Sequence, residues 1–127
     1  MNKLVSVIIT TYNRLELLKK ALKSVQKQSY DNIEIIGVDG SDNKLTENYI
    51  SNDGSIIYAK SKKNHPNILR NLGLECSNGD FIAFLDDDDT WEKEKTEKQI
   101  QCFQNNDIGL CYTGKNVLDK NDQKINY

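Results

Sequence analysis

The stretch FIAFLDDDDTW, residues 81–91, decides the fold class of this chain. Its first five residues, Phe81 to Leu85, have the length and composition of a strand buried on both faces of a parallel sheet. Four aspartates follow directly, and Thr90 is expected to cap a helix that starts at Trp91, a residue expected to anchor the core. Because one Asp or Thr is enough to cap a helix, four like charges at the end of a buried strand predict a further role.

Apolar runs and helical patterns alternate along the rest of the chain. Asn13 is expected to cap the first helix with Glu16 in the reciprocal position, and Pro66 suits the first turn of a later helix. The alternation predicts right-handed βαβ units in one α/β domain over residues 1–127, with a three-layer, mostly parallel, Rossmann-like sheet. Strands are expected at 4–10, 33–38, 55–59, 81–85, 109–113 and from 124, and helices at 14–28, around 47–49, from 66 and at 91–104.

Composition and charge exclude several classes of protein. Of the 127 residues, 37% are hydrophobic and 28% are charged, which allows one core. A net charge of −2 without a broad basic face argues against a nucleic-acid partner. Three cysteines without a CxxC pair are typical of free thiols in a reducing compartment. With no signal peptide and no apolar run near the roughly 18 residues of a membrane span, we expect a cytoplasmic domain. Association with the inner face of a membrane would depend on sequence outside this chain.

Polar residues follow three of the expected strands. Thr11–Arg14 comes after the first, Asp39–Asp42 after the second and Asp86–Asp89 after the fourth. We expect these loops to meet, because ligands of open parallel sheets bind outside the carboxyl ends of the strands. Carboxylates held close together repel unless a cation neutralises them, and hard oxygen ligands suit Mg²⁺, Mn²⁺ or Ca²⁺. Since Mg²⁺ combines carboxylates with substrate phosphates, the acidic loop predicts a divalent metal and a phosphorylated ligand.

Four segments together resemble one known family. They are VSVIITTYNR at 5–14, SVQKQSYDNIEIIGVDGS at 24–41, LRNLGLECSNGDFIAFLDDDDTW at 69–91 and EKEKTEKQI at 92–100. In order and spacing they are similar to family 2 of the nucleotide-sugar-dependent glycosyltransferases, which have the GT-A fold. The resemblance covers Val5 to about Ile100.

The resemblance implies contacts with the donor nucleotide. Thr11, Tyr12 and Arg14 would lie along the uridine or another nucleoside. Asp39 would accept a hydrogen bond from the base, typically a uracil imide. Arg70 would lie near the nucleotide.

The same resemblance implies a metal site in the acidic loop. Asp86 and Asp88 take the outer positions of the DxD motif, with Asp88 as the expected direct ligand of Mn²⁺ or Mg²⁺. Asp87 would reach the ribose. The metal would bridge the diphosphate and stabilise the leaving group as the sugar departs.

Three departures from the family pattern leave the donor open. Thr10 stands where a proline is usual, and VDGS at 38–41 has one acid fewer than the usual VDDGS. His65 and Pro66 replace a glycine. We therefore expect the fold to be kept, while the donor sugar is not defined.

The resemblance places the catalytic base and most acceptor contacts after residue 127. We therefore expect the chain to be the nucleotide-sugar-binding part of a longer enzyme of polysaccharide biosynthesis, and to be inactive alone. That enzyme would transfer a sugar, most simply from a UDP-sugar, to a glycan or lipid-linked acceptor, with metal assistance and inversion.

Two other interpretations fit part of the pattern. FLDDDDT also fits the DxDxT of haloacid-dehalogenase-like phosphatases, in which Asp86 would be the nucleophile and Asp88 the acid and base. That motif normally opens its domain, whereas here it lies two-thirds along. A non-catalytic receiver-like or nucleotide-binding module is the second alternative, although a receiver needs acids where this chain has Thr11 and Tyr12.

Overall fold

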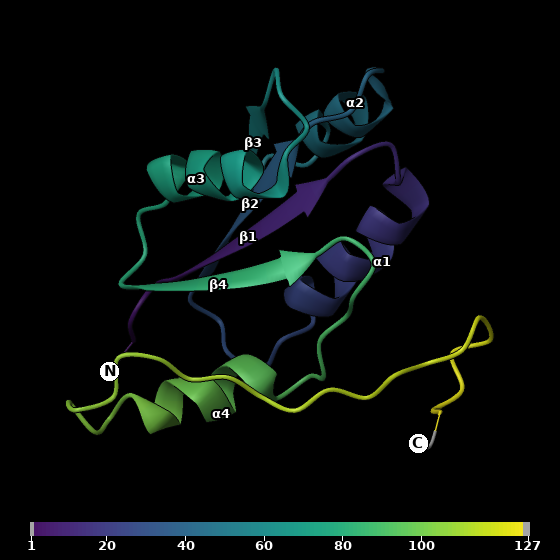
Figure 1. Cartoon of the computed structure of the whole chain (residues 1–127). Helices are drawn as coiled ribbons and strands as arrows, with labels where there is room; N and C mark the ends of the chain where they lie inside the picture. Colours follow the sequence, from purple (N-terminus) through teal and green to yellow (C-terminus); the bar gives the residue numbers. More distant parts are fainter. Residues whose placement is uncertain (1, 126–127) are drawn as a thin grey trace. The chain divides into compact units, whose positions relative to one another are not determined.

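Strands and helices alternate in the computed structural model, which describes residues 2–125 (Figure 1). The alternation predicted from the sequence is confirmed. The strands are β1 (Val5–Thr11), β2 (Ile33–Asp39), β3 (Ile56–Lys60) and β4 (Phe81–Asp86), and the helices are α1 (Leu15–Gln26), α2 (Leu45–Ser51), α3 (Pro66–Cys76) and α4 (Lys95–Cys102).

The four strands form one parallel sheet in the order β3-β2-β1-β4. The register is unbroken from one end of β1 to the other. At its carboxyl end Thr11 lies opposite Asp39 of β2, and Thr10 lies opposite Asp86 of β4. The loops after these three strands therefore share one edge of the sheet, as the sequence predicts.

Helices cover both faces of the sheet, which gives the predicted three layers (Figure 1). On one face α3 packs on a buried cluster in which Leu69 joins Ile8 and Ile36. Gly73 makes this close approach possible, because an added Cβ would lie 2.4 Å from Ile8 Cγ2. On the other face lies α1, whose buried residues follow helical spacing: Leu18, Ala21, Leu22 and Val25.

The helix predicted at 91–104 is shorter than expected and does not begin at Trp91. It runs from Lys95 to Cys102, and Thr90 does not cap it. The preceding segment is held instead by α1, where Ser24 Oγ accepts the backbone N–H of Trp91 at 3.1 Å. The side chain of Gln28 accepts the N–H of Thr96 at 3.0 Å, so a distant residue satisfies the first turn of α4.

The strand predicted at 109–113 is wrong: these residues belong to no helix or strand. Leu110 and Tyr112 are 81% and 87% exposed, and the segment has the residues of a strand but pairs with no other strand among the described residues. Beyond it, a single antiparallel bridge joins Leu118 to Lys124. The rest of the strand predicted from 124 includes residues outside those described.

Two compact units divide the chain, one ending at Glu97 and the other beginning at Lys98. All four strands and the residues predicted to bind the donor belong to the first unit. In the described part of the chain, every helix is too short or too polar to cross a bilayer.

Candidate functional site

The predicted site residues gather at the carboxyl ends of β2, β1 and β4. Asp39 and Asp86 end their strands, while Tyr12 and Arg14 lie between β1 and α1. Arg70, on α3, reaches the same edge because its Nη2 lies 3.2 Å from Asp86 Oδ1. The sequence therefore predicted which residues come together, although it did not predict how they contact one another.

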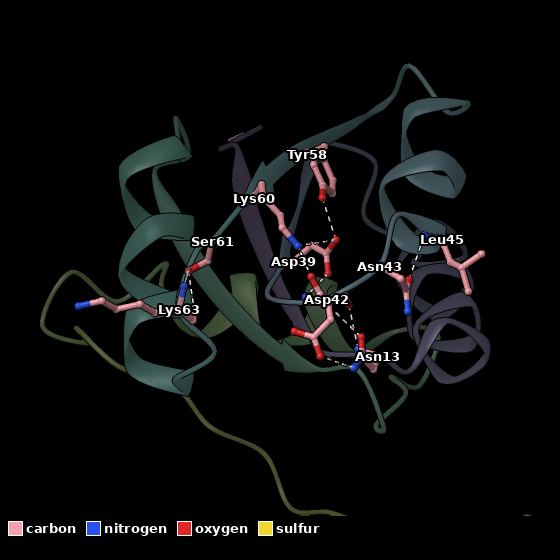
Figure 2. Close-up of polar contacts among 10 residues, drawn as sticks. Asn13, Asp39, Asp42, Asn43, Leu45, Tyr58, Lys60, Ser61 and Lys63 are labelled. Atoms are coloured by element: carbon pink, nitrogen blue, oxygen red, sulfur yellow. Dashed lines mark hydrogen bonds and ion pairs between the residues drawn. The ribbon is translucent and has the colours of Figure 1, made fainter.

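Asp39 is fully buried at the end of β2 and is fixed by its neighbours. Its Oδ1 accepts the backbone N–H of Ser41 at 2.8 Å, and its Oδ2 accepts the hydroxyl of Tyr58 at 2.7 Å. Lys60 Nζ lies 3.9 Å from the same Oδ2 and also donates to the carbonyl of Ser41 (Figure 2). Burial and the nearby carboxylate raise the pKa of Tyr58, so its hydroxyl stays protonated and donates to Asp39.

Tyr58 and Lys60 were not among the predicted site residues. The rule that ligand-binding groups follow the carboxyl ends of strands applies equally to β3, which ends at Lys60. Tyr58 lies two residues earlier and therefore projects from the same face of that strand. This position in β3 was the signal that could have identified both residues.

Asn13 does not cap α1, contrary to the capping box predicted with Glu16. Its φ of 51° is in the left-handed region, and the N-cap residue is Arg14, which makes no side-chain cap bond. The Asn13 amide group instead pairs with Asp42, donating to Oδ2 at 3.2 Å and accepting the Asp42 N–H at 3.1 Å (Figure 2). Asn tolerates the left-handed region, so the residue joins the β1 and β2 loops rather than starting a helix.

Tyr12 is partly exposed and belongs to the same connection between loops. Its hydroxyl donates to Asp42 Oδ2 at 2.8 Å. That hydrogen bond raises the pKa of Tyr12 and is the main reason that the pKa of Asp42 is lowered. The hydrogen bond thus ties the ring of Tyr12 to the loop that follows β2. Asp42 stays ionised at neutral pH.

Asp87 is the buried member of the acidic loop, with 1% of its side chain exposed. Its Oδ2 accepts from Thr11 Oγ1 at 2.8 Å and from Arg14 Nε at 3.1 Å. Its buried Oδ1 lies 2.7 Å from Arg14 Nη2, an ion pair that lacks the alignment of a hydrogen bond. Burial raises the pKa of Asp87, and the contacts with Thr11 and Arg14 oppose that rise. Thr11 and Arg14, both predicted to follow the nucleoside, therefore also hold the acidic loop in place.

The other three aspartates are exposed and form a cluster of carboxylates. Asp86, Asp88 and Asp89 each offer an oxygen, and these oxygens lie within 4.8 Å of one another. The backbone brings them together, since the N–H of Asp89 bonds to the carbonyl of Asp86 at 3.1 Å. Asp88 Oδ2 also lies 3.5 Å from Arg14 Nη1. The cluster fits Mg²⁺ or Mn²⁺ because all its ligand atoms are hard carboxylate oxygens. Asp89 was not among the predicted metal ligands, which were Asp86 and Asp88.

The His65-Pro66 substitution leaves the start of α3 intact. Pro66 occupies the first turn, as predicted, and His65 Nδ1 accepts the N–H of Asn67 at 3.3 Å. His65 is therefore the cap of the helix that carries Arg70 to Asp86. This departure from the family pattern does not separate the arginine from the acidic loop.

The family model for glycosyl transferase family 2 matches residues 6–126. The chain belongs to glycosyl transferase family 2. This family 2 chain resembles an uncharacterized glycosyltransferase of Rickettsia bellii, with 35% identity over 91% of this chain and 17% of the relative. A Campylobacter jejuni relative, GalNAc(5)-diNAcBac-PP-undecaprenol beta-1,3-glucosyltransferase, is 41% identical over 66% of this chain and 29% of its own length. The Escherichia coli relative WfgD, a UDP-Glc:alpha-D-GlcNAc-diphosphoundecaprenol beta-1,3-glucosyltransferase, is 34% identical over 98% and 53%.

Solved structures agree on the GT-A fold of this family 2 chain. S. aureus TarS 1-349 in complex with UDP-GlcNAc has a TM-score of 0.71 and 25% identity, over 80% of this chain and 31% of TarS. The mannosyltransferase PcManGT from Pyrobaculum calidifontis, in complex with GDP-Man and Mn²⁺, has a TM-score of 0.62 and 20% identity, over 75% and 30%. The family 2 chain spans 17% to 53% of the lengths of the three curated relatives named above.

Family membership decides against the phosphatase and receiver interpretations. The strand order agrees, because Asp86 ends the fourth strand rather than the first, and no acid follows β1 directly. The remaining alternative, a family 2 domain that binds a nucleotide without transferring a sugar, differs from an enzyme only in turnover.

Proposed function

We propose that this chain binds the nucleoside diphosphate of a nucleotide sugar, a UDP-sugar in the first instance, along the edge formed by β2, β1 and β4. The register carries the proposal. Asp39 and Asp86 stand on the strands that flank β1, so two strand spacings, roughly 10 Å, separate them. That span suits a nucleoside whose base is at Asp39 and whose diphosphate is at the acidic cluster.

Asp39 would recognise the base. Its buried carboxylate is held by Ser41 and Tyr58, so it is already oriented and loses little freedom on binding. A carboxylate accepts but does not donate, so it selects a base edge that offers an N–H, as the uracil imide does. The ring of Tyr12, held by Asp42, would lie along the nucleoside.

Asp86, Asp88 and Asp89 would hold a divalent metal, Mn²⁺ or Mg²⁺. Bound there, the metal would neutralise the diphosphate as it leaves the sugar. Arg14 and Arg70 already contact this cluster and would compensate charge that the metal leaves unbalanced. Asp87 is kept buried by Thr11 and Arg14 and so fixes the loop. Its carboxylate would contact the edge of the ribose.

The complete protein would transfer the sugar, with inversion, to a glycan or lipid-linked acceptor at the inner face of a membrane. The support is the naming of two family 2 relatives as glucosyltransferases of undecaprenol-diphosphate acceptors. An inverting transfer needs a base beside the acceptor hydroxyl. We place that base in sequence after residue 127, so this chain alone would bind the donor without turnover.

Calorimetry with UDP, CDP, GDP and ADP, in Mn²⁺ and in EDTA, tests the proposal. We expect UDP to bind in Mn²⁺ and to bind at least tenfold more weakly in EDTA. Asp39→Asn should reduce the preference for UDP over CDP by tenfold or more, since a hydrogen bond to a charged group is worth about 1.5–3 kcal/mol.

Asp107→Asn, an exposed carboxylate in the second unit, is the matched control and should leave UDP binding unchanged. Circular dichroism checks that each variant is folded. The proposal is wrong if folded wild-type chain binds no nucleoside diphosphate in Mn²⁺, or if it binds all four alike and Asp39→Asn changes nothing.

A further inference from the structure

A basic groove lies on the first unit; one of its walls follows the acidic loop directly in sequence, but no residue of that loop lines it. Its volume is about 610 Å³, and it runs between α1 and the segment that precedes α4. We call it the lysine groove. Its lining residues are Lys20, Lys23, Ser24, Lys27, Thr90, Trp91 and Lys93.

The lysine groove is built before any ligand arrives. Lys20, Lys23 and Lys27 recur at three- and four-residue spacing, which places them on one face of the α1 helix and its C-cap. Hydrogen bonds made by its backbone hold the opposite wall in place. The Trp91 N–H donates to Ser24 Oγ of α1 at 3.1 Å. Two backbone carbonyls of the same wall accept hydrogen bonds from residues just after α1. The Glu92 carbonyl accepts from Gln28 Nε2 at 2.7 Å, and the Lys93 carbonyl accepts from the N–H of Ser29 at 2.9 Å.

The residues that line the lysine groove carry a net positive charge. No carboxylate lines it, and within the described residues no ion pair involves Lys20, Lys23, Lys27 or Lys93. Beside the groove, Lys95 Nζ lies 4.4 Å from the centre of the Trp91 ring, a cation–π contact. Several cations in a preformed groove raise the local concentration of anions, although the chain as a whole carries a net charge of −2.

Trp91 gives the groove a second property. It was expected to anchor the core, yet it is only partly buried and forms part of the groove wall. An indole ring beside long lysine side chains is the combination that favours the interface between water and lipid, where the ring contacts the acyl boundary and ammonium groups reach the phosphates.

We propose that the lysine groove binds the phosphates of anionic lipid headgroups and orients the chain on a membrane surface. The charge favours an anion, and Trp91 favours a lipid interface over a free anion. The choice of a membrane also rests on the proposed function, in which the acceptor is lipid-linked. The site would thus hold the donor-binding domain beside the surface that carries its acceptor.

Vesicle binding by the whole chain tests this proposal, with Trp91 as the reporter because it is the only tryptophan. We expect its emission to shift to shorter wavelength, and the chain to sediment, with vesicles of phosphatidylcholine plus phosphatidylglycerol but not with phosphatidylcholine alone. Each lysine near an anionic surface contributes roughly a fivefold gain in affinity. The variant Lys20→Gln/Lys23→Gln/Lys27→Gln should therefore bind about 100-fold more weakly.

The matched control removes the same charge elsewhere, as Lys62→Gln/Lys115→Gln/Lys120→Gln, and should change vesicle affinity by less than about threefold. Binding should also be lost in about 1 M NaCl, where charges are screened beyond roughly 3 Å. Equal losses in the two triple variants would overturn the proposal in favour of diffuse attraction. Inorganic phosphate that binds the groove and abolishes the vesicle response at low concentration would overturn it in favour of a soluble anion.

UDP calorimetry on the same variants separates this inference from the proposed function. The groove variant should keep the UDP affinity of the wild-type chain, which also shows that it is folded. A wild-type chain that binds anionic vesicles but does not bind UDP would contradict the proposed function alone. Wild-type chain that binds UDP but ignores anionic vesicles would contradict the lysine groove alone.

Discussion

At the residue scale, two arginines contact the same acidic loop in different surroundings. Arg14 pairs with Asp87, whose side chain is 1% exposed, while Arg70 pairs with Asp86, whose side chain is 52% exposed. Removing the partner of a buried charge is costly because the charge remains out of water, whereas an exposed pair contributes little.

Arg14→Ala should therefore lower the free energy of unfolding by about 2 kcal/mol, less than for a fully buried pair because Arg14 is half-exposed. Arg70→Ala should lower it by no more than about 0.5 kcal/mol. Urea denaturation followed by circular dichroism measures both. Equal losses would mean that Asp87 does not depend on Arg14 for its burial.

Between residues and elements, Glu34 joins β2 to the turn that leads into β4. It is half-buried, and its Oε1 accepts the N–H of Asn78 at 2.6 Å. Partial burial raises its pKa, but hydrogen bonds from Ser6, Asn78 and Gly79 outweigh that effect and leave the pKa below its usual value. The ionised carboxylate therefore stabilises the fold above the pKa of the unfolded chain, and this contribution is lost as the pH falls through the folded pKa.

Glu34→Gln should lower the free energy of unfolding at pH 7 by about 1 kcal/mol, a modest value because solvent screens the group. The difference from wild type should shrink as the pH falls from the pKa of the unfolded chain, about 4.3, through the lower pKa of the folded carboxylate. Denaturation at several pH values measures the difference. Glu75→Gln, on the exposed side of α3, is the control and should be neutral throughout; a difference for Glu34→Gln that stays constant with pH would contradict the assignment.

At the element scale, the contact between α3 and β1 depends on the absence of a side chain at Gly73. A methyl group there would lie 2.4 Å from Ile8 Cγ2 and 3.2 Å from Val38 Cγ2. Alanine favours a helix over glycine by about 1 kcal/mol, but overpacking costs about 1–3 kcal/mol and the clash here is severe.

Gly73→Ala should thus destabilise the chain by about 1–2 kcal/mol, measured as a lower urea midpoint. Gly54→Ala is the control, since nothing lies within 4 Å of its added Cβ, and it should shift stability by no more than about 0.5 kcal/mol. A Gly73→Ala chain more stable than wild type would show that helix propensity outweighs packing at this contact.

The elements also show what the sequence could and could not predict. Pro66 marked the start of α3 correctly because its effect on the backbone is local. Asn13 and Thr90 were wrongly expected to cap helices, because partners far along the chain decide their segments: Asp42 binds Asn13, and Ser24 binds the N–H of Trp91. The strand expected at 109–113 is absent because a suitable composition is not enough: a strand also needs a backbone partner, which the local sequence does not specify.

At the scale of the whole molecule, parallel topology explains why the site could be predicted in outline. Once β1, β2 and β4 are neighbours, their carboxyl ends must bring Asp39 and the acidic loop to one edge. The finer arrangement, with Asp87 buried against Thr11 and Arg14 while its neighbours stay exposed, depends on side-chain packing that no motif spacing encodes.

The central claim is that this edge binds a cation and a diphosphate together. Electron paramagnetic resonance of Mn²⁺ measures this directly, because the signal of the free ion falls when the ion is bound. We predict that UDP strengthens Mn²⁺ binding to the wild-type chain at least tenfold and that Asp88→Asn removes this gain while Asp107→Asn keeps it. Mn²⁺ binding that is indifferent to UDP, or unchanged in Asp88→Asn, would contradict the account.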